Sequence, residues 1–430
     1  MASGDSGHAP DQRASAAGRS SWLPWALVAA TPVLLALVSW DTTGIYQPVQ
    51  AWFRLFGFAA IAVELVVIVA SVLAATQPLR PLALLPRWAK LALAVLVGVG
   101  FYTAVFVAPD ALRAIQWTFF SVVHILFGLA VAGLARTIDP LTQRAIWKGI
   151  LAGVCAYLLI VVVFVAAALA NRFDEWEYFG LGVTNIRQVG FYSVVGAGAA
   201  LGLATAEAHR ARRALYVLAA ALMLSLSFWS GTRGALIAIA VAFLVGAALL
   251  PALRTVRAWL MLAAAMAGGA LLSLAGPVPS PIYGIVRLSA SSGRHSPDVS
   301  SGRLDLWTGA WNAILQRPVT GYGAGQYFLV VQDQAGAFNH PHNIFLQILF
   351  HWGVLGAASY FALAAFLVWK AVVALRDPQP SDVPALLAGT SLLTMSLYEG
   401  SLFHSYPTMM IAFALAFILA VPRTPVGHSA

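Results

Sequence analysis

The sequence is divided into apolar runs that are each about as long as a helix that crosses a membrane. A spanning helix needs about 20 mostly apolar residues, because in hydrocarbon only a helix or a closed barrel satisfies every backbone polar group. The runs are too long and too continuous for the alternating strands of a barrel. Only 10% of the residues are charged, against roughly 25% in soluble domains. We identify twelve runs, at 22–40, 56–75, 88–108, 111–135, 146–170, 189–206, 215–229, 234–250, 258–275, 343–373, 383–397 and 406–421.

Lysine and arginine are distributed unevenly between the two ends of these runs. A cytoplasmic N-terminus places sixteen of the 25 basic residues, including every lysine, on the cytoplasmic side. By the positive-inside rule, both termini are therefore expected in the cytoplasm. The same rule explains the formal net charge of +9, so we expect no nucleic-acid partner. The outward-facing basic residues are all arginines, whose planar guanidinium suits phosphate oxygens better than a lysine ammonium does.

The connections between the runs are short, with one exception. The segment 276–342 has about 67 residues, and loops beyond ~15 residues are usually functional or disordered. Apolar residues recur at helical spacing over 301–316, so we expect this loop to fold. Gly353 is a candidate break in the tenth run. The predicted organisation is an all-α integral membrane protein with a disordered cytoplasmic tail (1–21), transmembrane helices 1 to 9 (22–275), a periplasmic loop domain (276–342), transmembrane helices 10 to 12 (343–421) and a cytoplasmic tail (422–430).

The motif His340-Pro341-His342-Asn343 stands where the long loop re-enters the membrane. Histidine exchanges a proton near neutral pH, and a position at a helix N-terminus disfavours its charged form. The motif therefore makes His342 a candidate neutral base, with His340 and Asn343 as supporting residues. Two simpler interpretations remain: Asn343 only caps the helix, and His342 only fills an interface. His340 and His342 could bind zinc, but a third ligand is not evident.

Three outward-facing arginines form the second feature. Arg233 lies in the tight turn Ser-Gly-Thr-Arg-Gly between two runs, Arg303 begins the expected loop helix, and Arg187 directly precedes the sixth run. Each arginine alone is more simply explained as one that extends toward lipid headgroups. Together with His342 on the same side, the three would form a cationic basin for a pyrophosphate.

These residues resemble the O-antigen ligase family, within the larger group that also includes O-antigen polymerases and pilin oligosaccharyltransferases. The pattern His-Asn, nine residues, then Gly-Val-Leu-Gly at 342–356 is similar to the family signature. Arg233 and Arg303 also match arginines of its pattern. The resemblance is strongest over 187–375 and extends to a topology with many spans and one long periplasmic loop. It implies that His342 is the catalytic base and that Arg233 and Arg303 hold the phosphates of the donor.

The resemblance also implies a role for Arg187 and a reaction. Arg187 would be a further phosphate ligand, although the family pattern varies at this position. The family signature does not require His340. The donor would be a glycan on undecaprenyl pyrophosphate and the acceptor lipid A core, at the periplasmic face of the cell inner membrane, among membrane lipids. Direct displacement predicts inversion at the anomeric carbon without a nucleotide or other cofactor. Two alternatives stay open: a polymerase or protein O-oligosaccharyltransferase with the same donor, and a lipid-linked-oligosaccharide transporter that cleaves nothing.

A metal site has only weak support in the sequence. The nearest acidic cluster is Asp174, Glu175 and Glu177 in the loop after the fifth run. Carboxylates of this kind can bind a hard cation, but a solvated acidic loop is the simpler interpretation. We therefore predict a metal-independent reaction.

Two further groups of polar residues are assigned structural roles. Glu64 and His124 lie inside apolar runs, where an unpaired charge is costly, so we expect them to pair within the bundle or to line the lipid route. Tyr398, Glu399, His404 and Tyr406 cluster at the outer turn between the last two runs. They could help to seat a sugar, but we favour an interfacial aromatic belt.

Overall fold

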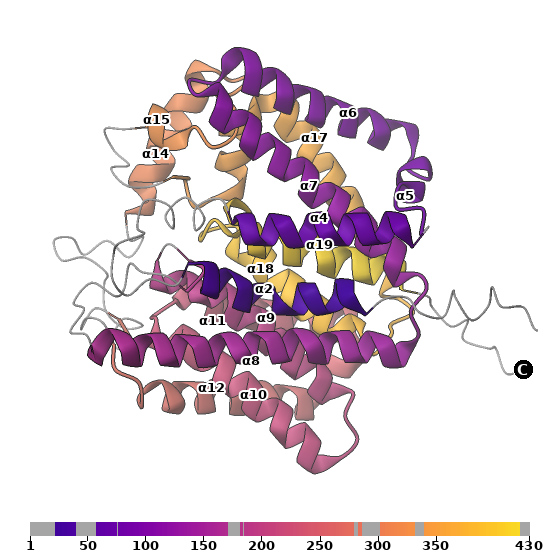
Figure 1. Ribbon diagram of the computed structural model, residues 1–430, viewed down its shortest axis with the longest axis vertical. Coiled ribbons are helices and arrows are strands. Elements are labelled where there is room, and N and C mark those ends of the chain that lie inside the picture. Colours follow the sequence, from indigo (N-terminus) through magenta and orange to yellow (C-terminus); the bar gives the residue numbers. More distant parts are fainter. Residues whose placement is uncertain are drawn as a thin grey trace, which may run out of the picture.

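The computed structural model is helical throughout its regular secondary structure. It describes residues 22–39, 57–74, 76–170, 181–183, 185–278, 283–285, 302–331 and 339–421, and all elements within these ranges are helices. Most of them run next to one another as a bundle (Figure 1). The prediction of an all-α protein is confirmed. The two predicted tails, 1–21 and 422–430, lie outside the described residues.

Seven of the helices are long and apolar enough to cross a membrane. They are α6 with its π-helical continuation η1 (Arg87–Val107), α7 (Ala111–Ala135), α8 (Pro140–Ala170), α9 with the preceding 3-10 helix η3 (Ile186–Thr205), α10 (Arg210–Trp229), α12 (Val256–Ser273) and α17 (Ile344–Ala374). Five shorter apolar helices accompany them: α2 (Leu23–Val38), α4 (Phe58–Leu73), α11 (Arg233–Leu249), α18 (Asp382–Met395) and α19 (Ser405–Ala420). The chain is therefore a membrane protein. Each predicted run corresponds to one of these helices, and the number of twelve crossings stays a prediction.

Two helices begin at least five residues before their apolar runs do. α8 begins at Pro140, where the Asp139 side chain accepts hydrogen bonds from the backbone N–H groups of Leu141 at 2.8 Å and Thr142 at 3.1 Å. α10 begins at Arg210, five residues before its apolar run. Apolar content marks the part of a helix that suits hydrocarbon, whereas the helix itself continues into its polar flank for as long as its terminal N–H groups find acceptors.

Helix α9 lies in the interior of the bundle. Every residue from Val189 to Ala204 is buried, and small residues let its neighbours approach closely. A side chain at Gly198 would lie 2.8 Å from the backbone nitrogen of Ala388 in α18. The position of the N-terminus of α9, which follows Arg187, is therefore fixed by packing on several sides.

The described part of the long loop packs against α17. It contains α14 (Arg303–Gln316) and α15 (Tyr327–Val330), so the helix expected over 301–316 is confirmed. The two short helices bury their apolar sides against Phe350 of α17. The buried residues of this cluster are Leu306, Ala310, Ala313, Ile314, Tyr322, Tyr327, Val331 and Phe350.

The expected break in α17 occurs at Gly353, where the loop is fixed to the helix. Gly353 has φ 58° and ψ −166°, a conformation open essentially only to glycine, and a Cβ there would clash with the Val319 carbonyl oxygen. The loop satisfies the backbone groups that the break leaves free. Its N–H groups at Tyr322 and Gly323 donate to the carbonyls of Phe350 at 2.9 Å and His351 at 2.8 Å.

The two ends of the bundle differ in what covers them. Helices α14 and α15 lie at one end, on the left of Figure 1, and the short helix α5 (Arg80–Ala83) lies at the opposite end. The chain order places the N-termini of α9, α11, α17 and α19 at the end that carries α14. We call it the loop end. Among the described residues, it holds His340, His342, Asn343 and the three arginines that the sequence singled out for chemistry.

Candidate functional site

His342 stands at the start of α17, one residue before the helix cap. The Asn343 side-chain oxygen accepts hydrogen bonds from the N–H groups of Phe345 at 2.9 Å and Leu346 at 3.2 Å, so Asn343 does cap the helix. His342 itself has φ 55°, which is uncommon outside glycine. Its own N–H donates to Nδ1 of His340 at 3.2 Å. The cap and this turn together fix the direction of the His342 imidazole.

Glu399 joins His342 to the loop helix. It lies in the turn between α18 and the 3-10 helix η5 (Ser401–Phe403). Nη2 of Arg303 donates to Oε1 of Glu399 at 2.7 Å, while the His342 imidazole hydrogen-bonds to the Glu399 backbone. A side chain at Gly234 of α11 would lie 2.9 Å from the same Oε1. Residues from α11, from α14 and from the segment before α17 therefore meet around Glu399.

Arg187 and Arg233 lie on two neighbouring elements beside this turn. The Thr232 hydroxyl, one residue before Arg233, donates to the Arg187 carbonyl oxygen at 2.7 Å. The Tyr398 hydroxyl donates to the carbonyl of Gly234 at 2.8 Å. These bonds hold the starts of α9 and α11 against each other and against the Glu399 turn. The arginines, which are far apart in the sequence, are thus brought to one region.

Helix N-termini converge in this region. Arg187 lies in η3 directly before α9, Arg233 begins α11, Arg303 begins α14 and His342 precedes the cap of α17. The N-terminus of a helix carries unsatisfied N–H groups and a partial positive charge. Such an end is suited to bind an anion, and the arginines add full charges to it.

The imidazole of His342 is held in its neutral form. Burial, together with the positive charges of Arg303 and Arg187, lowers its pKa to about 3, although the hydrogen bond to the Glu399 backbone acts in the opposite direction. A neutral imidazole carries one proton, so one ring nitrogen donates and the other is an acceptor. His342 is therefore in the protonation state that a general base needs.

His340 packs behind His342. Its side chain is 4% exposed, and its ring lies 4.1 Å from the His342 ring and 4.4 Å from that of Phe403. A side chain at Gly400 would clash with the imidazole. Burial holds the pKa of His340 well below its usual range. His340 thus supports the position of His342 from inside the protein.

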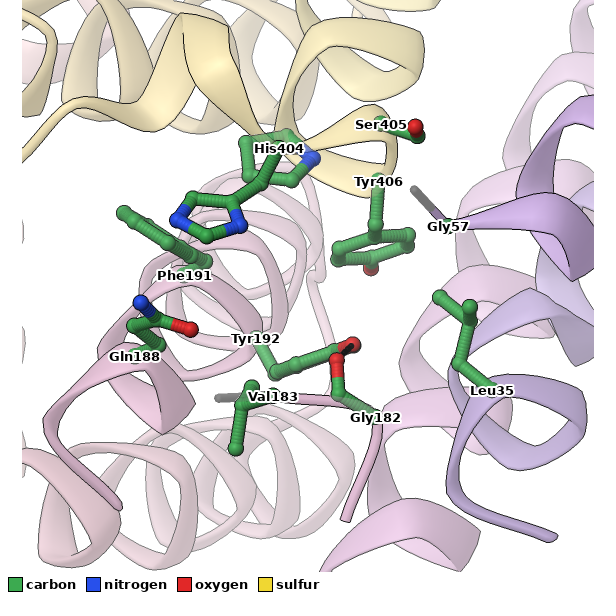
Figure 2. A pocket seen from close by; sticks show the side chains of 11 residues that line it. Leu35, Gly57, Gly182, Val183, Gln188, Phe191, Tyr192, His404, Ser405 and Tyr406 are labelled. Carbon is green, nitrogen blue, oxygen red and sulfur yellow. Dashed lines mark hydrogen bonds between the residues drawn. The ribbon is translucent and has the colours of Figure 1, made fainter. Parts of the chain in front are cut away.

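A narrow pocket of about 20 Å³ lies on the far side of His340. The His404 ring lies 5.7 Å from that of His340 and lines the pocket together with Tyr406, which stacks on Tyr192 at 4.5 Å. Figure 2 shows these side chains around the opening, with Phe191 next to His404. Tyr406 is 3% exposed, so the interpretation as an interfacial aromatic belt is wrong for this residue. The pocket is lined by Leu35, Gly57, Gly182, Val183, Gln188, Phe191, Tyr192, His404, Ser405, Tyr406 and Pro407.

The ion pair of Glu399 was not predicted from the sequence. We assigned Glu399 to the outer turn with the aromatic residues, whereas in the structure it pairs with Arg303. The available signal was its position as a carboxylate among outward-facing arginines, but 96 residues separate the two partners. Residues at that separation cannot be paired from sequence spacing alone.

The remaining polar residues lie away from His342 or outside the described residues. Glu64 Oε1 lies 2.8 Å from His124 Nδ1, so the expected pairing within the bundle is confirmed. The acidic cluster Asp174, Glu175 and Glu177 falls outside the described residues. Within the described ranges, no group of three or more His, Cys, Asp or Glu residues has the geometry to hold a metal ion.

Comparison with known proteins finds a family match for the central part of the chain. No curated protein matches the sequence. The family model described as O-antigen ligase matches residues 218–361, a stretch that contains Arg233, Arg303 and His342 and the break at Gly353. This stretch of the chain is therefore similar to the O-antigen ligase family.

Proposed function

We propose that this protein transfers O-antigen polysaccharide from undecaprenyl pyrophosphate to lipid A core. The family match indicates a glycosyltransferase of the O-antigen ligase or polymerase type and implies lipid-linked glycan and lipid A-type substrates in general. The choice of the ligase reaction, the donor and the acceptor is our proposal. We place the protein in the cell inner membrane, with the loop end in the periplasm and both termini in the cytoplasm.

One observation carries the proposal: a neutral imidazole is held among arginines. The positive charges of Arg303 and Arg187 act on the His342 ring, and burial keeps that ring unprotonated. A base and an anion-binding surface side by side are what a displacement reaction on a sugar pyrophosphate requires. A transporter would need neither the low pKa nor its placement beside the arginines.

The reaction exchanges one bond at the anomeric carbon for another. A hydroxyl oxygen of the acceptor sugar attacks that carbon while the bond to the pyrophosphate oxygen breaks. The hydroxyl proton passes to the unprotonated ring nitrogen of His342, and the electron pair of the broken bond leaves with undecaprenyl pyrophosphate. Attack opposite the leaving group inverts the anomeric configuration. General-base assistance of this kind contributes typically ~10²–10⁴-fold.

The arginines stabilise the charge that develops on the leaving group. Arg303, Arg187 and Arg233 stand at helix N-termini, so guanidinium groups and helix dipoles act on the pyrophosphate together. Pyrophosphate is a good leaving group that needs no protonation, and no nucleotide is required at this face. We propose that the reaction is independent of metal ions, with His340 and Asn343 holding His342 in place.

Reconstitution of the full chain tests the proposal. Purified protein in liposomes would receive the lipid-linked glycan and lipid A core without nucleotide, in the presence of a chelator. We expect glycan-bearing lipid A and released undecaprenyl pyrophosphate with the wild type, and neither product with His342→Ala. The matched control is His209→Gln, because His209 is exposed at the opposite end of the bundle.

Other products would contradict specific parts of the proposal. Longer glycans that stay on the polyprenyl carrier would identify a polymerase. Glycan that crosses the bilayer without cleavage would identify a transporter. Activity that is lost with the chelator and restored by magnesium would overturn metal independence.

A further inference from the structure

A groove lies between α10 and α12 at the end of the bundle opposite to the loop end. α11 runs from the loop end to this opposite end, so α12, which follows it, begins beside the start of α10. Both helices lie at the lower edge of the bundle in Figure 1. With a rise of about 1.5 Å per residue, the part of α10 from Val217 to Trp229 separates the groove from the Arg233 turn by roughly 18 Å. The groove is therefore distinct from the candidate active site.

The groove has an apolar floor. Its volume is about 330 Å³, and Val217, Leu260 and Met261 form part of its lining. Leu260 is 64% exposed. Further along the two helices the groove ends, because a side chain at Gly269 of α12 would lie 3.0 Å from the Ala221 carbonyl oxygen of α10. An apolar groove of this kind, on the outer face of a membrane protein, suits an acyl chain.

The mouth of the groove is cationic. Arg210 and Arg213 of α10 and Arg257 of α12 line it, at the N-terminal ends of two helices. The nearby carboxylate of Glu207 is engaged by Arg144 at 2.7 Å and by Arg212 at 3.7 Å. Among the residues that the structure describes, no carboxylate lies within ion-pair distance of Arg210 or Arg257.

We propose that this groove binds one anionic phospholipid, with its phosphate at the three arginines and an acyl chain along the apolar floor. The positive charge of the mouth complements a lipid phosphate, and the apolar floor can hold an acyl chain. A free phosphate would fill the mouth and leave the floor empty. Basic pockets between membrane helices recognise anionic headgroups in this way. The positive-inside rule assigns this end to the cytoplasm, where the groove would meet the inner leaflet. The inference does not depend on the proposed glycosyl transfer.

Lipid titration of the purified full chain tests the charge requirement. The detergent-solubilised protein is titrated with phosphatidylglycerol or with phosphatidylcholine of the same acyl chains, and bound lipid is counted by native mass spectrometry. We expect one phosphatidylglycerol to bind well before any phosphatidylcholine does. The triple variant Arg210→Gln, Arg213→Gln, Arg257→Gln should bind phosphatidylglycerol at least about tenfold more weakly. If the triple variant does not fold, the single variant Arg257→Gln replaces it. Arg257 lies on the exposed first turn of α12, and its substitution should show part of the same loss.

A matched variant separates the groove from general charge. The substitutions Arg80→Gln, Arg87→Gln and Arg376→Gln remove the same number of exposed arginines near other helix ends, and this control should bind phosphatidylglycerol as the wild type does. Equal weakening of the two triple variants would overturn the proposal. So would wild-type binding by the groove variant, or equal binding of the two lipids by the wild type.

A second pair of measurements tests the acyl chain. Ala264 also lines the groove and is exposed, so Ala264→Trp fills the groove without changing its charge. We expect this variant to bind phosphatidylglycerol about tenfold or more weakly, because association in hydrocarbon depends on close packing and the indole would occupy the space along which the acyl chain lies. Glycerol phosphate, which offers the phosphate alone, should not compete at lipid-saturating concentrations. Competition by glycerol phosphate, or unaltered binding by Ala264→Trp, would show an anion site instead of a lipid site.

Discussion

The arginines at the two ends of the bundle differ in their surroundings. At the loop end, the Arg303 side chain is 23% exposed and donates to Glu399 at 2.7 Å. At the opposite end, Arg210 and Arg257 are exposed at the mouth of a groove. A partly buried, oriented guanidinium can be aimed at one position in space, whereas an exposed one samples many. The difference agrees with the two proposals, which assign glycan transfer to the loop end and lipid binding to the opposite end.

The same contrast applies to the two carboxylates that pair with arginines. Glu399 binds Arg303 at the loop end and Glu207 binds Arg144 at the opposite end, both at 2.7 Å. Only Glu399 also has its backbone bonded to a histidine whose pKa is lowered. Equal distances therefore do not imply equal roles. Substitutions at corresponding positions of the two ends test this comparison directly.

The largest effect is expected from Arg303→Ala. The substitution removes a donor from the position where charge develops on the leaving group, and loss of one such donor typically costs about 10²–10³-fold in kcat. Arg376→Ala, at an exposed position that follows α17 at the opposite end, should leave kcat unchanged. Both variants are compared with the wild type by steady-state kinetics of glycan transfer in liposomes.

The lysine variant sharpens this prediction. Arg303→Lys keeps the charge and loses the two-pronged donor geometry, so we expect its kcat between those of Arg303→Ala and the wild type. If properly inserted Arg303→Ala transfers glycan at the wild-type rate, Arg303 does not hold the phosphate. If Arg376→Ala is as impaired as Arg303→Ala, the contrast between the two ends is wrong.

Helices and local breaks could be predicted from the sequence because they depend on neighbouring residues. Apolar content located every long helix, and the spacing over 301–316 located α14 in the loop. The break at Gly353 was also expected, because a glycine inside an apolar run marks a possible interruption. Helix starts such as Pro140 were missed, since they depend on a cap outside the apolar run.

The contacts of the site could be predicted only in part. His342, Arg303 and Arg187 were selected because they flank helix starts on one predicted side. The bond between Arg303 and Glu399 and the burial of Tyr406 depend on how distant helices pack. Periodicity reports which face of a helix is apolar, but it does not report which helix covers that face. Tyr406 was therefore assigned to the membrane interface instead of to the pocket.

A smaller effect is expected from Glu399→Gln. The amide keeps the shape and an acceptor oxygen but removes the charge that orients Arg303, so we expect kcat to fall by about tenfold, less than for Arg303→Ala, because the guanidinium remains and is only misplaced. Glu207→Gln, which weakens the matching pair at the opposite end, should leave kcat unchanged. Both rates are measured at saturating donor.

Two controls distinguish positioning from folding. Glu399→Asp keeps the charge on a shorter side chain and should recover part of the lost kcat, which a purely structural defect would not predict. The thermal unfolding of Glu399→Gln should resemble that of Glu207→Gln. Equal losses of kcat in Glu399→Gln and Glu207→Gln would mean that the ion pair at the loop end only holds the fold together.

The smallest expected effect is a pH dependence that is nearly absent. A general base works in its unprotonated form, and kcat/KM reports the pKa of the free enzyme. Burial lowers the pKa of His342 to about 3, so the base is unprotonated at all pH values well above that, and kcat/KM should not decline near the ordinary histidine pKa of about 6.5. Bound pyrophosphate is negative and favours the imidazolium, so the acidic limb of kcat should lie at higher pH than that of kcat/KM. Rates of transfer from about pH 5 to 8 test whether kcat/KM is flat across this range and whether kcat declines toward its acidic end. An acidic limb in kcat/KM near pH 6.5 would mean that His342 is hydrated in the free enzyme. The loop end would then be as open to water as the opposite end, where the arginines are exposed, and the contrast between the two ends would fail.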